Sequence, residues 1–521
     1  TLFPYTTLFR SVELEALNRV RFGKIVSKKE CDKYCQPHGI KPIACRWVLG
    51  SKEIDNKPGV RCRLVVQQIA AGNGVAAALG YSSATPSTEA VRALLIDVAS
   101  QCWTIGVMDV STAFMHADLP PGVHVAIRLP ADVSATKDIH SPTYAIASKA
   151  LNGLCCASKA WLQLKQVTKS HGLVSCPTGP CAFKGVFRRG KFSCRMVLIL
   201  YVDDILVGCD SPHGLENLRD AFLDRVSKVK ITGQLNPDQP GTITFLGREP
   251  TCFAGSKNLS QTDTPPQIDL EKDTSDKGNE PLSAEAASKY RSILGRVAWY
   301  CQTRQDLLRF VSILSTGQSA PLHKHEIGLN KLLRYLKANL HIHQELRNSG
   351  GDRTIHLYTD ASWGGKSYSG YVIFWCGSML KSVSRCQVTI SLSACEAEMV
   401  AIAQGCQETL GVLHLLDFFN GNAEMPIKTI EDFLKANVEE LPKSLFVIRT
   451  DSESSQKLLQ ADGFNRRTRH LHLAHAFVQR LIFHEVLVIQ WVSTDDQIAD
   501  VLTKILDKVK FEKFRKMMGF I

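Results

Sequence analysis

Two adjacent aspartates interrupt one of the most apolar stretches of the chain, in a pattern that suggests chemistry. The stretch Met196–Gly208 reads MVLILYVDDILVG. Such a run predicts buried strand, where an ionised carboxylate costs several kcal/mol unless it has a partner. We therefore predict a hairpin with strands at Met196–Val202 and Ile205–Val207 and a turn at Asp203–Asp204. Asp is common in turns, so this could be an ordinary exposed turn. It could also be a metal site, and the two interpretations are compatible.

A third aspartate ends another apolar segment. Asp109 lies near the end of Ile105–Val110, which reads as a strand. Alone, it could be no more than the N-cap of a following helix. Together with Asp203 and Asp204 it offers three carboxylates on two adjacent strands. Such a set can hold two Mg²⁺ ions about 4 Å apart for in-line displacement at phosphorus.

The C-terminal region repeats this logic with different spacing. Asp360 ends a strand, Glu398 lies in a long helix, Asp451 ends a later strand and Asp500 opens the last helix. Each residue alone is as easily explained as a cap or a surface charge. Four acidic residues at strand ends and on helices can converge on one point of a mixed sheet, so we predict a second two-metal site, of the nuclease kind.

The elements that must position these residues follow from hydrophobic periodicity. Apolar runs alternate with helical stretches in residues 13–247, a charged Pro-containing linker covers Asp263–Ala284, and Tyr290–Leu340 is helical. From Ile355 the order is three strands, a helix, a strand, helices, a strand and a helix, which implies a mixed sheet with helices on its faces. Asn420–Lys443 is predicted to be an insertion, and Thr1–Val12 a terminal scar outside the fold.

Composition sets broad limits. The 521 residues carry 62 Lys+Arg against 50 Asp+Glu, a net charge of +12 that weakly favours a polyanionic partner. No apolar stretch approaches the roughly 20 residues that span a bilayer. The 17 cysteines are predicted to be reduced and mostly buried in an intracellular protein.

Several motifs resemble the Pol polyprotein of copia-type LTR retrotransposons. In the reverse transcriptase region they are MDVSTAF (Met108–Phe114), KALNGLCCASKAW (Lys149–Trp161) and YVDD (Tyr201–Asp204). In the RNase H region they are TDASW, SLSACEAEM, RTDS and DQIADVLTK. The resemblance implies a multidomain α+β and α/β fold, with a right-hand polymerase followed by a helical connection and an RNase H-like mixed sheet. The fingers and palm would cover 13–250, the linker and thumb or connection 251–350, and the RNase H-like domain 351–521, with its insertion at about 420–443.

The same resemblance assigns roles to individual residues. Asp109 and Asp203 would bind both polymerase metals with Asp204 in support, while Tyr201 and Val202 would lie at the substrate. Further implied contacts are Phe114 under the sugar of the incoming nucleotide, Arg63 and Arg92 at its triphosphate, Asp360, Glu398, Asp451 and Asp500 at the nuclease metals, and His470 in a basic loop at the nucleic acid.

The activity implied is an RNA-directed DNA polymerase that also cleaves the RNA of RNA–DNA hybrids, with two Mg²⁺ per site and Mn²⁺ as an alternative. The implied partners are an RNA template, a DNA primer, the hybrid and dNTPs, with no membrane. A larger Gag-Pol polyprotein with capsid and integrase is expected, in a cytoplasmic virus-like particle or the nucleus. Two alternatives stay open: a catalytically decayed nucleic-acid-binding or structural remnant, because Cys155 and Cys156 replace the family's Lys-Gln, and a nuclease-only protein.

Overall fold

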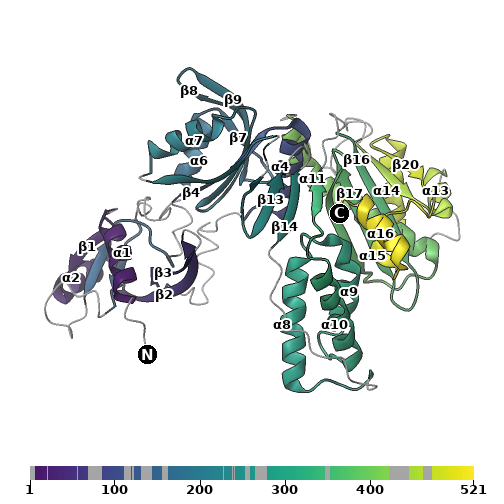
Figure 1. The fold of residues 1–521 in the computed structure, drawn as a ribbon, viewed down its shortest axis with the longest axis horizontal. Coiled ribbons are helices and arrows are strands. Elements are labelled where there is room, and N and C mark those ends of the chain that lie inside the picture. Colours follow the sequence, from purple (N-terminus) through teal and green to yellow (C-terminus); the bar gives the residue numbers. More distant parts are fainter. Residues whose placement is uncertain are drawn as a thin grey trace.

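The computed structural model arranges the chain as a row of lobes, from an N-terminal sheet at one end to a C-terminal sheet at the other (Figure 1). Within the residues described, the strands form four open sheets, so the coarse expectation of a mixed α and β fold is confirmed. The structure describes residues 6–19, 21–54, 57–68, 85–110, 119, 122–130, 143–154, 162–226, 228–237, 239, 241–252, 259–263, 278–346, 353–421, 445–461 and 472–521.

The N-terminal lobe is a five-stranded sheet in the order β1-β6-β5-β2-β3, accompanied by two helices. Its elements are α1 (Thr6–Arg19), β1 (Gly23–Val26), α2 (Lys28–His38), β2 (Ile43–Ile54), β3 (Lys57–Val66), β5 (Ala126–Arg128) and β6 (Tyr144–Ala147). Helix α1 begins at Thr6, so it includes part of the segment 1–12 that was predicted to lie outside the fold, and its Leu17 shares a core with Leu64 of β3; that the segment is a terminal scar stays a prediction. A helix once nucleated extends residue by residue, so the residues before Glu13 continue the same turns.

The next lobe is a six-stranded sheet in the order β11-β4-β10-β9-β8-β7. Helix α4 covers one face, with Leu94 and Leu95 in one core with Val107 and Ile199, whereas α6 and α7 cover the other. Its elements are α4 (Thr88–Gln101), β4 (Thr104–Val110), α6 (Leu162–Ser170), β7 (Leu173–Ser175), β8 (Ala182–Arg189), β9 (Phe192–Tyr201), β10 (Asp204–Cys209), α7 (Gly214–Leu223) and β11 (Val229–Leu235). Coverage of both faces explains why the sequence of β9 and β10 is apolar at nearly every position rather than alternating.

A small four-stranded sheet and a group of helices follow. The sheet order is β12-β13-β14-β15, and the helices project away from it as Figure 1 shows. The elements are β12 (Gly241–Thr242), β13 (Arg248–Cys252), β14 (Leu259–Asp263), α8 (Ala284–Tyr300), η3 (Gln305–Leu307), α9 (Leu308–Ser315), α10 (His323–Ala338) and β15 (Gln344–Leu346). Leu294, Val297 and Leu333 are among the buried residues that join these helices, so the helical region expected at residues 290–340 is present.

The C-terminal lobe is a mixed five-stranded sheet in the order β18-β17-β16-β19-β20. The first three strands are antiparallel, and β19 and β20 continue parallel to β16. Its elements are β16 (Ile355–Ser362), β17 (Tyr368–Trp375), β18 (Ser378–Cys386), α11 (Ala394–Asn420), β19 (Phe446–Thr450), α13 (Glu453–Gln460), α14 (His472–Phe483), β20 (Leu487–Trp491), α15 (Asp500–Thr503) and α16 (Lys508–Met517). The strand and helix order matches the sequence prediction, whereas α16 was not predicted, and most of the predicted insertion at 420–443 lies outside the described residues.

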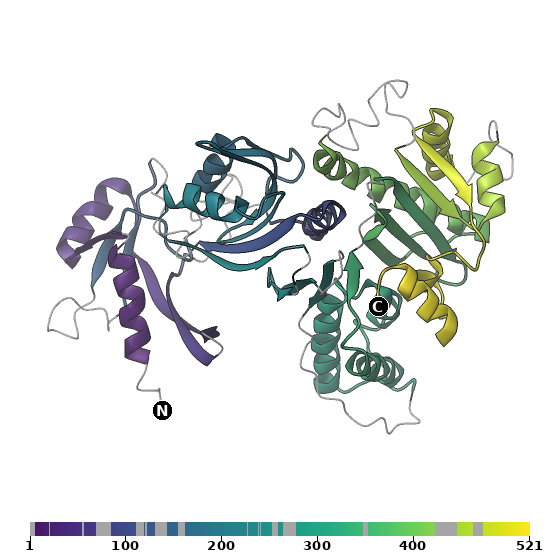
Figure 2. The same ribbon diagram turned by 45° about the horizontal axis from the view of Figure 1, so that its top comes forward.

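Helix α4 packs on two lobes at once. It contacts β9 and β10 of the six-stranded sheet and also α11 and β18 of the C-terminal lobe, so the two lobes share one continuous core (Figure 2). Asp97 of α4 is fully buried at this boundary. It accepts a hydrogen bond from Arg353 Nη2 at 2.6 Å and pairs with Lys184 Nζ at 3.4 Å. A buried carboxylate flanked by two cations ties the lobes together electrostatically as well as by apolar contact.

Two expectations about the chain as a whole can be compared with the described residues. No helix in those ranges combines the length and the apolar character that crossing a membrane requires. The cysteines that the structure describes are all free thiols, and most of them are buried.

Candidate metal centres

The first candidate centre is the turn between β9 and β10. The two central residues of the turn are Val202 and Asp203, because Tyr201 pairs with Asp204 across the hairpin. The turn therefore starts one residue earlier than predicted. Val202 has φ +53°, in the left-handed region that β-branched residues avoid. Such a conformation costs about 1–2 kcal/mol and is typical of functional sites.

Strand pairing brings Asp109 to this turn. Asp204 of β10 lies directly opposite Asp109 of β4. The backbone N–H of Val110 donates to the carbonyl oxygen of Asp203 at 2.9 Å, which makes Asp109 and Asp204 a non-hydrogen-bonded pair. In such pairs the Cα atoms are about 4.5 Å apart and the side chains share a face. The structure therefore places the three predicted aspartates together at one sheet end, although their carboxylate oxygens do not all approach within 4.8 Å.

A lysine lies next to Asp109 on the same face of the sheet. Lys230 of β11 pairs with Asp109 on the side of β4 opposite to Asp204, and it is exposed. Cross-strand neighbours share a face, so one cation stands beside two carboxylates. Sequence reasoning missed Lys230, because only the pairing of β11 with β4 brings it to the site. The donor set is entirely carboxylate, which suits a hard ion such as Mg²⁺.

The structure treats the remaining predicted substrate-binding residues differently from one another. Phe114 lies outside the described residues, and so does His470 of the basic loop. Arg63 lies in β3 and is half-buried, with nothing in the structure that assigns it a ligand. Arg92 is a correction: it is 1% exposed in α4 and donates to the carbonyl oxygens of Leu380 and Gln302. A guanidinium enclosed and paired in this way joins lobes of the protein and does not face a nucleotide.

The second candidate centre begins at the carboxyl ends of two parallel strands. β16 and β19 pair in parallel with Tyr358 opposite Arg449. Two residues beyond this pair come Asp360, still in β16, and Asp451, directly after the end of β19. Both acidic residues therefore reach the same edge of the sheet.

Helix α11 adds the third acid. Ala361 of β16 forms a small buried cluster with Ala397 and Ala401 of the helix. The small side chains where α11 crosses β16 allow the helix to approach the sheet closely. Glu398 is the next residue of α11 after Ala397. One ligand oxygen from each of Asp360, Glu398 and Asp451 lies within 4.8 Å of the other two. Among the described residues, these three acids form the group whose ligand atoms already lie close enough together to hold one metal ion.

The electrostatics of this trio point to a bound cation. Burial, together with the neighbouring charge of Asp360, raises the pKa of Glu398 to about 9. Burial also raises the pKa of Asp360 to about 6, with Lys504 opposing this effect. Glu398 Oε2 is buried and has no hydrogen-bond partner among the described residues. A divalent ion would satisfy this oxygen and favour the ionised carboxylates, so the residues present fit Mg²⁺ or Mn²⁺.

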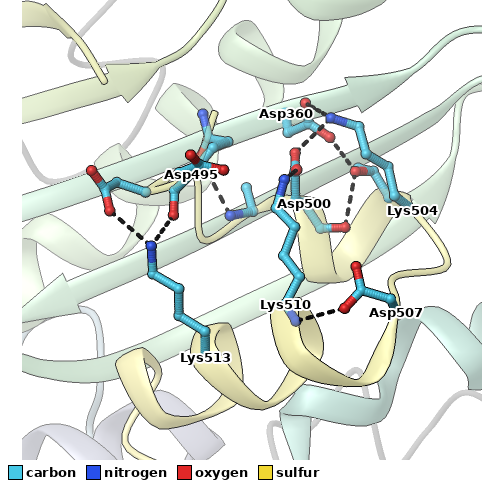
Figure 3. A network of polar contacts seen from close by, with 11 residues as sticks. Asp360, Asp495, Asp500, Lys504, Asp507, Lys510 and Lys513 are labelled. Atoms are coloured by element: carbon cyan, nitrogen blue, oxygen red, sulfur yellow. Dashed lines mark hydrogen bonds and ion pairs between the residues drawn. The ribbon is translucent and has the colours of Figure 1, made fainter. Parts of the chain in front are cut away.

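The fourth predicted ligand has other partners. A Cβ on Gly370 of β17 would lie 2.6 Å from Thr503 Cγ2, so this glycine allows α15 to pack against the sheet beside Asp360. Asp500 of α15 then accepts from Lys504 Nζ at 2.6 Å and from Lys510 Nζ at 3.1 Å (Figure 3). The structure thus gathers three of the four predicted acids as a ligand group and engages Asp500 with lysines instead.

Comparison with known proteins identifies the class of the N-terminal half. Residues 32–264 match the family described as reverse transcriptase (RNA-dependent DNA polymerase), so the chain contains a domain of this family. Both the hairpin of β9 and β10 and the strand β4 that bears Asp109 lie inside the matched region.

The chain is similar over most of its length to longer plant proteins. It is 27% identical over 509 residues to the retrovirus-related Pol polyprotein from transposon RE1 of Arabidopsis thaliana, covering 93% of this chain and 32% of that protein. It is also 27% identical over 511 residues to the retrovirus-related Pol polyprotein from transposon RE2 of the same plant, covering 93% of this chain and 32% of that protein. To the retrovirus-related Pol polyprotein from transposon TNT 1-94 of Nicotiana tabacum it is 26% identical over 514 residues, covering 93% of this chain and 36% of that protein. The predicted resemblance to copia-type Pol polyproteins is therefore confirmed, and the chain spans about a third of the length of these relatives.

Proposed function

We propose that the chain is an RNA-directed DNA polymerase with a C-terminal ribonuclease H domain. The observation that carries the polymerase half is the pairing of Asp109 with Asp204 beside the Val202–Asp203 turn, inside the reverse transcriptase match. The proposal divides the chain into fingers and palm at 13–250, a linker with thumb or connection at 251–350, and an RNase H-like domain from 351. Its substrates are an RNA template, a DNA primer and dNTPs.

The proposed polymerase chemistry depends on a small set of charges at one sheet end. Divalent ions bound there would stabilise the charge that develops on the transferred phosphoryl group and its leaving group. Asp109 and Asp203 would be the main oxygen ligands, with Asp204 in support. Asp109 and Asp204 lie opposite each other on a rigid pair of strands and Asp203 directly precedes Asp204, so the three carboxylates would need little reorganisation. Lys230 places a positive charge beside them, where it reduces the repulsion between the carboxylates.

Primer extension tests the polymerase half. The wild-type chain should extend a DNA primer on an RNA template with Mg²⁺, and Asp203→Asn should abolish extension. Asp224→Asn is a matched control, because Asp224 is an exposed aspartate of the same lobe that pairs with Arg189. Equal and negligible extension by the wild type and by Asp203→Asn, with hybrid binding intact, would support the decayed-remnant alternative.

The acidic trio favours a second activity, cleavage of the RNA strand of RNA–DNA hybrids. A metal held by Asp360, Glu398 and Asp451 would activate water for attack at phosphorus. Hybrids are distinguished by groove shape and 2′-hydroxyls rather than by base sequence. Asp451→Asn should abolish hybrid cleavage, whereas Glu453→Gln, an exposed acid two residues away, should not. Cleavage without primer extension would select the nuclease-only alternative.

The proposal extends to the setting of the chain. Its relatives are Pol polyproteins, which supports a role as one part of a Gag-Pol polyprotein that also contains capsid and integrase. A virus-like particle in the cytoplasm is the proposed place of action. Co-sedimentation of the chain with element RNA in a particle fraction tests this, and recovery of the chain only in unassembled fractions would contradict it.

A further inference from the structure

A partly exposed lysine lies between two acids of the proposed nuclease site. Lys504 follows the single turn α15, four residues after Asp500. Its Nζ donates to Asp500 Oδ1 at 2.6 Å and lies 3.3 Å from Asp360 Oδ1, so it joins two acids from different elements (Figure 3). The same ammonium group therefore occupies the space between the two carboxylates.

The remaining oxygens of these two acids also have protein partners. Thr503 Oγ1 donates to Asp360 Oδ2, and Lys510 Nζ donates to Asp500 Oδ2 at 3.1 Å. Every carboxylate oxygen of Asp360 and Asp500 is thus engaged. Glu398 differs, because its Oε2 is buried with no hydrogen-bond partner among the described residues.

The charges of the side chains around this site indicate how many divalent ions it can hold. The pocket holds four carboxylates, from Asp360, Glu398, Asp451 and Asp500, and two ammonium groups, from Lys504 and Lys510. With all four carboxylates ionised, as a bound cation would favour, four negative and two positive charges leave a net charge of −2, which one divalent ion neutralises. A second divalent ion between Asp360 and Asp500 would stand against the ammonium group of Lys504 at short range, where charges repel strongly.

We propose that Lys504 takes the place of a second divalent ion in this pocket. One metal ion is held by Asp360, Glu398 and Asp451, while Lys504 holds Asp360 and Asp500 together. Lys504 is a positioning residue: it orients Asp360 towards the metal and fixes α15 against the sheet. This inference rests on the proposed nuclease function, and it replaces the two-metal expectation for the C-terminal site.

Counting bound Mn²⁺ by electron paramagnetic resonance tests the inference without measuring cleavage. The full chain is used with Asp109, Asp203 and Asp204 changed to Asn, so that ions at the polymerase site do not contribute. The reference is the same chain with Glu398→Gln and Asp451→Asn added, and the difference between the two counts belongs to the nuclease pocket. We expect one Mn²⁺ in this difference, and two when Lys504→Gln is introduced.

Two further variants make the test specific. Lys504→Arg retains the positive charge and should keep the count at one. Lys510→Gln removes a lysine that donates to Asp500 Oδ2 rather than to the Oδ1 that Lys504 holds, and it should also keep the count at one. If Lys504→Gln does not fold, as judged by circular dichroism, the count for the chain that retains Lys504 decides alone.

The possible results separate this inference from the proposed function. Two ions, or none, in the chain that retains Lys504 would overturn the inference. An unchanged count of one in folded Lys504→Gln would also overturn it, because the lysine would then exclude no ion. One ion without hybrid cleavage would contradict the nuclease function alone, whereas two ions with cleavage would contradict only the single-metal pocket.

Discussion

The buried ion pair on α4 provides the sharpest stability prediction. Asp97→Asn keeps the volume of the side chain but leaves Arg353 and Lys184 facing a neutral amide. Removing one partner of a buried pair costs about 3–5 kcal/mol. The side chains of Arg353 and Lys184 are 30% and 20% exposed, and Arg353 keeps a 2.6 Å hydrogen bond to Asn420 Oδ1, so solvent and this bond recover part of the loss. We expect a decrease of about 2–3 kcal/mol in the free energy of unfolding.

A double-mutant cycle measures the pair itself. Urea unfolding of wild type, Asp97→Asn, Arg353→Gln and the double variant should give a coupling energy of about 1–3 kcal/mol. The control cycle uses Glu453 and Lys457, a pair with exposed side chains at 2.9 Å, where about 0.3–0.5 kcal/mol is expected. Because the pair spans two lobes, Asp97→Asn should also separate unfolding into two transitions. A coupling energy as small as that of the control would refute the reasoning.

Three further predictions concern the two candidate centres. Gly370→Ala should destabilise the chain by about 1–3 kcal/mol in thermal unfolding, because its Cβ meets α15 at 2.6 Å, whereas Gly364→Ala, with nothing within 4 Å, should change stability by less than about 0.5 kcal/mol. Val202→Gly should leave stability unchanged or raise it by up to about 1 kcal/mol, since it relieves the strain at φ +53°; a clear loss in urea unfolding would contradict this. In EDTA, Tm should fall as pH rises from about 4.5 towards 9, because the raised pKa of Glu398, about 9, makes the folded state bind the proton that the unfolded state has released. Glu398→Gln or Mg²⁺ should flatten this dependence, and a flat wild-type profile in EDTA would refute it.

Local patterns predicted much of what positions the sites. The apolar run around Asp203 predicted the hairpin because both faces of its sheet are covered, and the strand and helix order after Ile355 followed from periodicity. The position of the turn was missed by one residue. Sequence rules favour Asp over Val in a turn, and the pairing of Tyr201 with Asp204 overrides that local preference.

Contacts between distant segments could not be predicted in this way. Arg92 has the sequence of an ordinary helical arginine, and only the packing of α4 on the C-terminal lobe shows that its partners lie more than 200 residues away. The position of Lys230 depends on strand register, which periodicity does not provide. Lys504 was different, because its place four residues after Asp500 is visible in DQIADVLTK, a spacing at which an acid and a lysine can pair.

The double packing of α4 limits how this polypeptide could be cut or recombined. A fragment that ended before Arg353 would expose to water the apolar surface that α4 buries against α11, and would remove one of the two cations of Asp97. A fragment that began there would carry Arg353 without its acidic partner. Neither half is a self-sufficient module. A hybrid protein built by exchanging one half between relatives must therefore also keep matching residues on both sides of the contact between α4 and the C-terminal lobe.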